Sequence, residues 1–352
     1  MSPDAAPANA HSTERSSEPL LPWLLAPLNL ALKTQRGHAT LVHASSGVGA
    51  LPFVLALAQA WLCEASGVTE VPSAACGHCG SCRLIASHLH PDLHVLLPET
   101  LRRALAWPLR DDKLESDDKK KPSKQIRIDE VRSLIDWVHK TSARGRGKVV
   151  LLHPADVLNQ QSANALLKTL EEPPPGTRLL LTTADPNTLL PTVRSRCQLL
   201  RLHPPAAEQA AAWLSGQGVA HAPVLLAACS GRPLDALALA QSGVDAATWA
   251  ALPQAVARGQ TGAMTGWPVA QMLDALHKLC HDAMARAAGA ATRYFPLASV
   301  PSSAQLPALL AWSAEIDRIA RHAEHPWNEA LLLEALLAQG RHALDPSNRV
   351  LV

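Results

Sequence analysis

Apolar residues recur along this chain in two different patterns. In roughly the first two hundred residues, short runs that are almost wholly apolar alternate with longer segments in which apolar residues return every three or four positions. The short runs predict buried strands, and the longer periodic segments predict amphipathic helices. Because strands that alternate with helices build parallel sheets covered on both faces, this region predicts an α/β domain.

The predicted elements of this domain lie between residues 20 and 204. A leucine-rich helix over 20–32 should be interrupted at Pro27. Strands are predicted over 39–44, 93–97, 149–152 and 178–183, and helices over 51–63, 128–138 and 162–170. Residues 101–125 break the pattern because they carry both charge signs without an apolar face, and we expect a mobile surface insertion there.

The second part of the chain shows helical periodicity only. Past His203 no strand is predicted, and short helices over 208–214, 224–229 and 234–240 are separated by glycine and proline. Longer helices follow, and two of them carry apolar stripes, which consist of Met272, Leu276, Leu279 and Ala283 and of Leu309, Trp312, Ile316 and Ile319. A last helix contains Ala330, Leu333 and Leu337. We expect a small helical domain over 205–245 and a larger one over 246–352.

Composition and charge narrow the class of protein. The chain has 352 residues, of which 47% are hydrophobic and 3% aromatic, and its formal net charge is +2. The near-neutral charge argues against a strongly basic nucleic-acid binder that acts alone. No run of 18 or more apolar residues predicts a membrane span. Residues 1–19 lack the pattern of a signal peptide, so we expect a short disordered leader and a cytoplasmic protein.

The segment Leu41–Leu51, Leu-Val-His-Ala-Ser-Ser-Gly-Val-Gly-Ala-Leu, resembles in shape a phosphate-binding loop between a strand and a helix. A working loop needs a lysine for the β- and γ-phosphates and a hydroxyl residue for Mg²⁺. Gly47 and Gly49 hold the turn positions, but Ala50 stands at the lysine position and Leu51 at the hydroxyl position. Backbone N–H groups at a helix start can attract an anion, but we expect no functional nucleotide site.

A second motif of nucleotide hydrolysis is also degenerate. An active domain carries Asp-Glu directly after the strand that corresponds to 149–152, where the acids hold Mg²⁺ and polarise the attacking water. This chain has His153 and Pro154 there, and Asp156 is displaced to a position where we expect it to cap the next turn. Two separate defects predict a domain that does not hydrolyse ATP.

Four of the seven cysteines form a cluster in the sequence: Cys63, Cys76, Cys79 and Cys82. Four thiolates close a tetrahedron around Zn²⁺ and leave no position for water or substrate, which predicts a structural zinc module over 63–90. Two alternatives stay open, namely His78 as a ligand in place of Cys63, and thiols that are free or redox-active. The other three cysteines lie in apolar surroundings and are expected to be buried core thiols: Cys197, Cys229 and Cys280.

Two further segments resemble a known family. They are Asn159-Gln-Gln-Ser-Ala-Asn-Ala-Leu-Leu-Lys-Thr-Leu-Glu-Glu-Pro-Pro174 and Leu189-Leu-Pro-Thr-Val-Arg-Ser-Arg-Cys197, which ends in Ser-Arg-Cys. Both segments closely resemble sequences of the clamp-loader branch of the AAA+ ATPases. A cysteine module inserted after the first helix is likewise a feature of bacterial clamp-loader subunits. With the two degenerate motifs, the chain resembles a non-hydrolysing subunit of the bacterial DNA polymerase III clamp loader. The motifs cover residues 20–240, and the C-terminal helices match only in length, position and helical character.

The resemblance implies an AAA+ α/β domain over 20–204 with an inserted zinc module, a helical lid over 205–245 and a helical collar over 246–352. It implies a hetero-pentameric ring with γ/τ and δ subunits that places the sliding clamp on primed DNA, as a component of the DNA polymerase III holoenzyme. The chain itself should have no ATPase activity, and its apolar collar stripes should bury against neighbouring subunits. The alternatives are an ATP-hydrolysing γ/τ-type subunit and a zinc-dependent nucleic-acid-binding module.

In this family, the arginine of Ser-Arg-Cys reaches across a subunit interface to ATP held by a neighbouring γ/τ subunit. The resemblance gives this role to Arg196, with Ser195 as motif support and Arg194 as a weaker candidate. A guanidinium supplied in trans stabilises charge that develops on the γ-phosphate, so hydrolysis comes to depend on assembly. The alternative for Arg196 is a surface salt bridge.

Three other family positions are informative. Thr183 occupies the polar sensor position, where it either senses a phosphate or satisfies backbone groups. Leu234 stands at the second-sensor arginine position, and Arg232 lies two residues too early. Lys168 either faces primer–template DNA in the assembled ring or pairs with a glutamate at the end of its helix.

Overall fold

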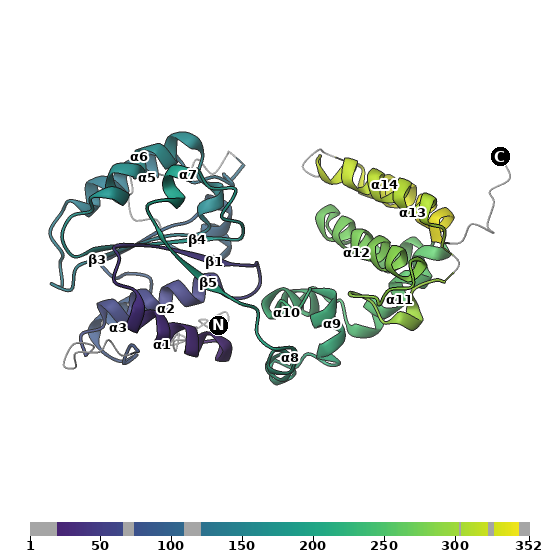
Figure 1. Ribbon diagram of the computed structural model, residues 1–352, viewed down its shortest axis with the longest axis horizontal. Coiled ribbons are helices and arrows are strands. Elements are labelled where there is room, and N and C mark those ends of the chain that lie inside the picture. Colours follow the sequence, from purple (N-terminus) through teal and green to yellow (C-terminus); the bar gives the residue numbers. More distant parts are fainter. Residues whose placement is uncertain (1–19, 66–73, 109–120, 303, 323–326, 345–352) are drawn as a thin grey trace, which may run out of the picture. The chain divides into compact units, whose positions relative to one another are not determined.

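The chain divides into two compact units, Met1–His203 and Pro204–Val352 (Figure 1). The computed structural model describes residues 20–65, 74–108, 121–302, 304–322 and 327–344. The expected leader over 1–19 and the middle of the charged insertion, 109–120, lie outside the described residues.

A five-stranded parallel sheet forms the middle layer of the first unit. Its strand order is β2-β3-β4-β1-β5. The strands are β1 (Ala39–Ala44), β2 (Leu93–Leu96), β3 (Lys148–Leu152), β4 (Thr177–Thr183) and β5 (Gln198–Leu202). Every residue of β3 is buried, as expected for an interior strand of a sheet that is covered on both faces. The predicted α/β architecture is confirmed.

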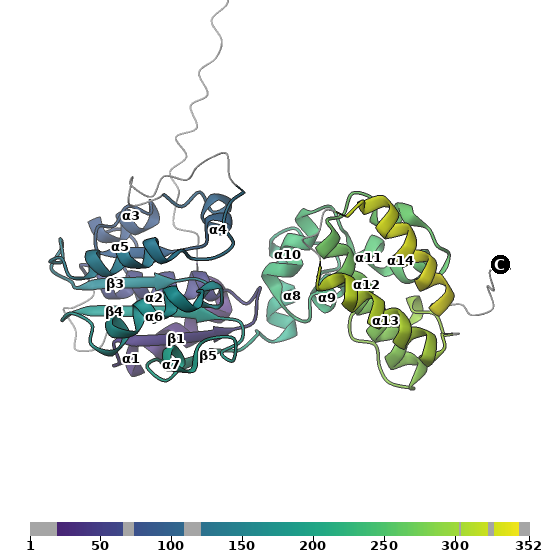
Figure 2. The ribbon, with the colours of Figure 1, turned by 90° about the horizontal axis from the view of Figure 1, so that it is seen from above.

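Helices cover both faces of this sheet. Helices α1, α2 and α3 lie on one face, and α5, α6 and α7 lie on the other (Figures 1 and 2). The helices of the unit are η1 (Pro22–Leu24), α1 (Leu25–Thr34), α2 (Ala50–Leu62), α3 (Gly80–Ala86), α4 (Glu99–Ala104), α5 (Ile128–Val138), η3 (Ala155–Val157), α6 (Gln160–Glu171) and α7 (Pro191–Arg194). Leu134 of α5, Leu166 of α6 and Leu181 of β4 belong to the core on the second face, and none of the three is exposed.

Two predictions about the secondary-structure elements of this unit were wrong. Pro27 does not interrupt the first helix, because it is the third residue of α1 and a proline in the first turn removes no intrahelical hydrogen bond. The charged insertion does not begin at residue 101, because Glu99–Ala104 forms the helix α4. Within this helix Arg103 forms an ion pair with Glu99, with 2.7 Å between the nitrogen and the oxygen. Beyond α4, Trp107 stacks on His88 with 3.7 Å between the ring centroids.

The second unit is all-helical, as predicted, and has one hydrophobic core that draws on residues from Ala210 to Leu344. Its helices are α8 (Ala207–Gly216), α9 (Ala222–Ala228), α10 (Pro233–Gln241), α11 (Ala246–Ala257), η4 (Thr261–Met264), α12 (Val269–Ala287), η5 (Leu297–Ser299), α13 (Leu306–Ala320) and α14 (Glu329–Leu344). The division of this unit into a lid over 205–245 and a collar over 246–352 stays a prediction. Among the described residues no single helix meets the criteria for a membrane span, although the bent pair α9 and α10 meets them jointly.

The apolar stripes of the second unit do not face outward. The residues of the two stripes on α12 and α13 are at most 4% exposed, and all of them belong to the unit's own core. The expectation that these stripes bury against neighbouring subunits is therefore wrong. Exposed leucines of the same unit lie elsewhere, and they include Leu297, Leu306, Leu310 and Leu331.

Candidate functional site

The loop between β1 and α2 has the backbone of a phosphate-binding turn. Gly47 and Gly49 have φ angles of 73° and 106°, a region that side chains with a Cβ rarely adopt. Val48 between them is fully buried, and its carbonyl accepts a hydrogen bond of 2.8 Å from the indole Nε1 of Trp23. The positive φ angles that these two glycines permit thus explain why the loop keeps the backbone conformation of a phosphate-binding turn.

The side chains at the end of this loop do not suit a nucleotide. Ala50 is the first residue of α2 and Leu51 is the second, so a methyl and an isobutyl group occupy the positions of the lysine and the hydroxyl. Neither side chain has an atom that can bind a phosphate or Mg²⁺.

His153 stands where an active domain has the first acid after β3. Its Nδ1 lies 2.7 Å from Oγ1 of Thr182 on β4. Burial lowers the pKa of the His153 imidazole to about 4, against a smaller opposing effect of Asp156. The imidazole is therefore neutral at pH 7 and does not replace the charge of a carboxylate.

Asp156 does not cap the next turn, in contrast to our expectation. Its carboxylate accepts hydrogen bonds from the hydroxyl of Thr183, from the backbone N–H of Ala184 at 2.9 Å and from the hydroxyl of Thr188 at 3.1 Å. These contacts tie the η3 turn to the end of β4 and to the loop that follows it. The sensor-position hydroxyl of Thr183, which is buried, is thus bound to an acid of its own domain.

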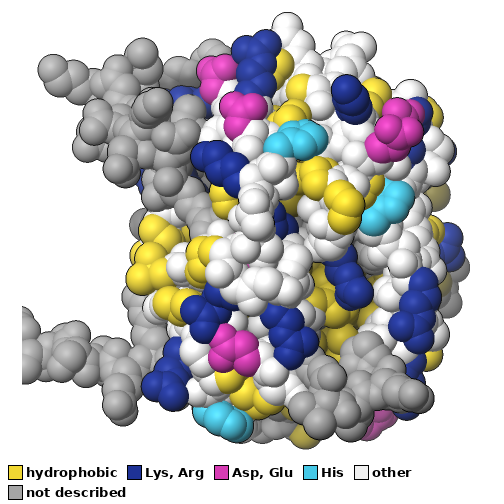
Figure 3. Space-filling view, turned by 90° about the vertical axis from the view of Figure 1, so that its left-hand side faces the viewer, with side chains coloured by type: hydrophobic (Ala, Val, Ile, Leu, Met, Phe, Trp, Pro, Cys, Tyr) yellow, Lys and Arg dark blue, Asp and Glu magenta, His cyan; other side chains and the backbone are white. Residues whose placement is uncertain are grey.

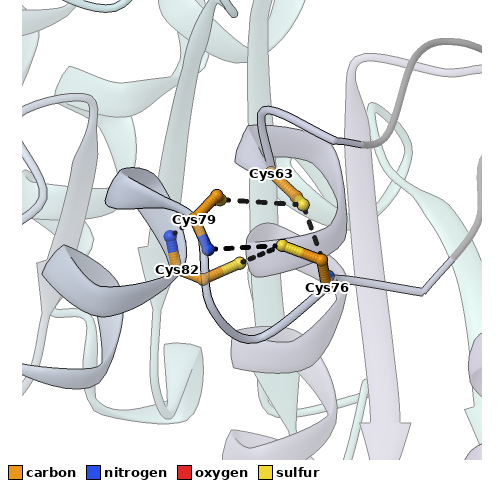
Figure 4. A group of neighbouring side chains, drawn as sticks. All are labelled: Cys63, Cys76, Cys79 and Cys82. Carbon is orange, nitrogen blue, oxygen red and sulfur yellow. Dashed lines mark hydrogen bonds between the residues drawn. The ribbon is translucent and has the colours of Figure 1, made fainter.

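The four clustered cysteines meet in space. Their sulfur atoms lie within 4.8 Å of one another, and the side chains point toward a common centre (Figure 4). Two Sγ–Sγ distances, Cys63–Cys79 and Cys76–Cys82, are 3.9 Å. A tetrahedral Zn–S₄ site with bonds of about 2.3 Å places its sulfur atoms about 3.8 Å apart. The donor set and its spacing therefore fit a closed tetrahedral metal site.

The knuckle backbone also favours thiolates at this centre. The N–H groups of Cys76, Cys79 and Cys82 each point to the sulfur of another cluster cysteine, at 3.4 Å. Burial raises the pKa of the Cys82 thiol, and contacts with Cys79 and Cys63 raise it further. A bound cation would reverse this effect, since a metal ligand must be deprotonated. His78 is exposed and its Nδ1 contacts the carbonyl of Cys76 at 2.8 Å, so the four sulfur atoms meet without it.

A polar network joins the cysteine cluster to the sheet. Glu64, next to Cys63, pairs with the guanidinium of Arg144 in the loop before β3, and Ser81 of α3 also donates to Glu64, at 3.1 Å. Arg144 Nε lies 2.9 Å from Ser81 Oγ. The Glu64–Arg144 hydrogen bond lowers the pKa of the Glu64 carboxyl. The cluster is thus attached to the α/β core by charge-assisted hydrogen bonds.

The buried carboxylate of Asp92 fixes the other end of this network. It accepts from the backbone N–H groups of Ala143 at 2.7 Å and Arg144 at 2.8 Å, and from the hydroxyl of Ser142 at 3.0 Å. Sequence reasoning missed Glu64, Ser81, Asp92 and Arg144. A usable signal was the run Arg144-Gly-Arg-Gly147 directly before a strand, because glycines there permit the tight loop that a carboxylate can cap.

Arg196 lies at the edge of the sheet where the strands begin. It precedes β5, and its Nε donates to Oε1 of Glu171, the last residue of α6, at 2.7 Å. A second nitrogen of its guanidinium, Nη1, donates to the carbonyl of Thr192 at 2.8 Å. The surface ion pair that was the alternative interpretation is therefore present in the isolated chain. Ser195 is exposed and donates to the carbonyl of Thr192 at 3.2 Å.

The remaining predicted positions are not brought together with Arg196. Arg194 donates to Oδ1 of Asn187 at 3.0 Å. Lys168 is exposed on α6, and within the described part of the chain it forms no ion pair. Arg232 belongs to the second unit, where it pairs with Asp235 at 2.8 Å, and Leu234 is half-buried beside it.

Comparisons with known proteins agree with this geometry. The model of a family described as "DNA polymerase III, delta subunit" matches residues 25–206. The DNA polymerase III subunit delta' of Pseudomonas aeruginosa is 36% identical over 231 residues, which are 64% of this chain and 62% of that protein. The subunit delta' of Escherichia coli is 32% identical over 279 residues, which are 73% of this chain and 76% of that protein.

A subunit with a different name is also similar. The DNA polymerase III subunit tau of Escherichia coli is 33% identical over 215 residues, which are 59% of this chain but only 29% of that protein. The two delta' subunits above match a larger share of the chain than subunit tau does, and the family model covers more than half of it. The chain therefore belongs to the delta' (δ′) family of DNA polymerase III subunits.

Proposed function

We propose that this chain is the non-hydrolysing, stator-like δ′ subunit of a DNA polymerase III clamp loader and helps to place the sliding clamp on primed DNA. One observation carries the proposal: two nucleotide motifs are lost from a domain that keeps the family's fold and its Ser-Arg-Cys segment. Ala50 and Leu51 replace the phosphate and metal ligands, and a neutral His153 replaces the first acid. A single lost motif would be weaker support.

In this proposal Arg196 completes the ATP site of an adjacent γ/τ subunit. Its guanidinium stands at an exposed edge of the sheet, and its side chain is 31% exposed. A planar, permanently charged group of this kind suits the charge that develops on a transferred phosphoryl group. Ser195 supports the motif by holding the turn between α7 and β5 through its bond to Thr192. Thr183 has no nucleotide to sense in this proposal, because Asp156 engages its hydroxyl.

The cysteine cluster is proposed to hold one structural Zn²⁺ through Cys63, Cys76, Cys79 and Cys82. Four sulfur ligands leave no open position for water or substrate. The ion would stabilise the fold of the knuckle. The contacts with neighbouring subunits would be made by the chain's own residues.

The proposed setting is a cytoplasmic, replisome-associated ring that also contains γ/τ and δ subunits, with the sliding clamp and primed DNA as further partners. The first unit serves as an AAA+ domain, and the lid over 205–245 and collar over 246–352 connect it to the ring. The exposed leucines Leu306, Leu310 and Leu331 are better candidates for collar contacts than the buried stripes.

Equilibrium binding of a labelled ATP analogue tests the first part of the proposal. We expect no Mg²⁺-dependent binding by the purified chain at nucleotide concentrations that saturate a γ/τ subunit. Tight Mg²⁺-dependent binding, or ATP turnover by the chain alone, would instead favour the alternative of a γ/τ-type subunit, for which the similarity to subunit tau is the only support.

Reconstitution tests the second part. The chain is mixed with γ/τ and δ subunits, clamp and primed DNA, and the stimulated ATPase is measured at saturating chain concentration. Arg196→Ala should assemble normally but lower turnover, because the site that it completes loses its trans arginine. Normal turnover would refute the assignment of Arg196.

A further inference from the structure

The buried carboxylate of Asp92 fixes the loop before β3 to the sheet. Asp92 is 1% exposed and directly precedes β2, and its carbonyl accepts a hydrogen bond of 2.9 Å from the backbone N–H of Val149 on β3. Its carboxylate accepts from the backbone N–H groups of Ala143 at 2.7 Å and Arg144 at 2.8 Å. Because hydrogen bonds to a carboxylate are strong and directional, the backbone from which the Arg144 side chain starts has a fixed position.

The guanidinium of Arg144 reaches from this loop to the cysteine knuckle. Its Nε lies 3.0 Å from Oε1 of Glu64 and 2.9 Å from Oγ of Ser81, and its Nη2 also donates to Oε1 of Glu64. Glu64 directly follows Cys63, and Ser81 directly precedes Cys82. One guanidinium therefore joins the neighbours of two proposed ligands that are far apart in the sequence.

The hydroxyl of Ser81 uses its full hydrogen-bonding capacity. Ser81 is fully buried, and its Oγ donates to Glu64 at 3.1 Å and accepts from Nε of Arg144. Nε2 of buried His90 lies 3.1 Å from the same oxygen, and it carries the hydrogen of the neutral ring because the N–H of Asp92 donates to Nδ1. A hydroxyl offers one donor and two acceptor sites. Loss of the arginine would leave one of these sites unsatisfied in the middle of the knuckle.

Gly80 leaves room for this guanidinium. A Cβ at Gly80 would lie 2.9 Å from Nη2 of Arg144 and 3.6 Å from both carboxylate oxygens of Glu64. Gly80 is the first residue of α3 and directly follows Cys79, so the arginine packs against the backbone of the knuckle itself. A methyl group at this position would displace the end of a flexible side chain and leave the backbone in place. The contact between Gly80 and Arg144 can therefore be broken from either side.

The charge of Arg144 also suits the cluster. Zn²⁺ bound by four thiolates is a dianion, and positive charge nearby stabilises it. Arg144 lies before the start of β3, and on the face where the strands begin lysine and arginine side chains are more abundant than aspartate and glutamate (Figure 3). The same guanidinium pairs with Glu64, whose carboxylate would otherwise place an unbalanced negative charge next to Cys63.

We propose that Arg144 is a positioning residue of the four-cysteine metal site and raises its affinity for the metal. By holding Glu64 and Ser81, it fixes the backbone on both sides of the cluster before the metal binds. The inference rests on the part of the proposed function that assigns one Zn²⁺ to the cluster, and it does not depend on Arg196 or on ring assembly. Loss of a residue that orients metal ligands typically lowers metal affinity by about ten- to a hundredfold.

The test measures the Zn²⁺ affinity of the full chain in reducing buffer, by competition with a chromophoric chelator. The variants are Arg144→Gln, Gly80→Ala and the double substitution. We expect each single substitution to raise the Kd about tenfold or more. The double variant should be no weaker than the weaker single variant, because both changes remove the same guanidinium. Arg132→Gln is the matched control, since it breaks an ion pair of the same unit in which the Arg132 side chain is 66% exposed, and its Kd should stay within twofold of wild type.

Thermal unfolding with and without Zn²⁺ separates a role at the metal site from a general loss of stability. A residue that only stabilises the framework changes the unfolding midpoint equally in both forms. Because metal binding energy is also folding energy, a residue that sets metal affinity lowers the midpoint of the metal-loaded chain more than that of the metal-free chain. We expect this second result for both Arg144→Gln and Gly80→Ala.

The metal assignment and the role of Arg144 can fail separately. If wild type holds no Zn²⁺, the assignment of the ion is wrong, and the inference about Arg144 falls with it. If wild type holds one Zn²⁺ and the folded single variants bind it with unchanged Kd, only the role of Arg144 is wrong. Equal midpoint losses with and without Zn²⁺, or a double variant whose loss is the product of the two single losses, would also overturn that role.

Discussion

Glu171 holds the guanidinium of Arg196 at the edge of the sheet in the isolated chain. The contact joins the last residue of α6 to the residue that precedes Cys197, and the Nε–Oε1 distance is 2.7 Å. The two side chains are 47% and 31% exposed, so the pair is solvated and is worth at most about 1 kcal/mol. A phosphate that approaches Arg196 can therefore displace Glu171 at small cost.

Arg196→Lys should separate charge from geometry at this position. Lysine keeps the positive charge but lacks the planar fork, so we expect it to lower turnover at the one completed site by about a hundredfold or more. Glu171→Gln serves as the control and should change turnover less than threefold. Both are measured as stimulated ATPase of the reconstituted assembly. Equal turnover for Arg196→Lys and wild type would show that only the charge matters.

Removal of a cluster ligand should remove one metal ion. We expect about one Zn²⁺ per chain by elemental analysis and almost none in Cys79→Ser. Because the binding energy of a structural Zn²⁺ is also folding energy, we expect the variant, or wild type with a strong chelator, to unfold at least several degrees lower. Cys229→Ser should keep its metal, because Cys229 is a buried thiol of the second unit and is not part of the four-cysteine cluster. Unaltered melting after complete metal removal would contradict a structural role.

His153 should make the stability of the chain depend on pH. Its pKa is about 4 in the folded chain and about 6.5 in the unfolded chain, so only the unfolded chain binds this proton between these values. The stability from a neutral His153 is therefore complete above pH 6.5 and is lost as the pH falls toward 4. At pH 5 the loss is about 2 kcal/mol. Urea unfolding of wild type and His153→Gln at pH 7.5 and pH 5 measures it, and equal pH dependence of the two would contradict the assignment.

Gly340 should not tolerate a methyl group. A Cβ at this position of α14 would lie 2.7 Å from Cζ2 of Trp312 and 2.9 Å from Cγ1 of Val256, which is closer than side chains pack. We expect Gly340→Ala to destabilise the second unit by about 1–3 kcal/mol in denaturant unfolding. Gly216→Ala is the control, because a Cβ there meets nothing within 4 Å, and its stability should be unchanged or slightly raised. A neutral Gly340→Ala would mean that α13 and α14 can move apart.

The elements that could be predicted from the sequence are those whose burial leaves a local signal. The apolar run of β3 and the periodic apolar face of α5 each identify one element without reference to the rest of the chain. Strand β5 was not predicted, because only Leu202 of its five residues is buried and its place comes from pairing with β1. The short helix α3 was also missed, because the cysteine knuckle sets where it begins and a periodic apolar pattern does not.

The contacts of the candidate site likewise divide into local ones, which could be predicted from the sequence, and distant ones, which could not. The spacing of the four cysteines is local, and the structure brings their sulfur atoms together as expected. The bond between Asp156 and Thr183 joins residues 27 positions apart, and the pair of Arg196 with Glu171 joins residues 25 positions apart. Such contacts depend on which strands are neighbours in the sheet, and periodicity alone does not report strand order. For this reason the partner of Arg196 could not be read from its motif.

The attachment of the cysteine knuckle has a consequence for protein engineering. Arg144 lies in the loop before β3, where its backbone N–H donates to the buried carboxylate of Asp92. Its side chain forms an ion pair with Glu64 and a hydrogen bond with Ser81, both of the knuckle. Excision of the knuckle in favour of a short linker would leave this arginine beside a strand start without the groups that neutralise and orient it. A miniaturised version of the domain would therefore have to redesign that loop together with the excised segment. The knuckle is part of the domain's framework and cannot be treated as a detachable insert.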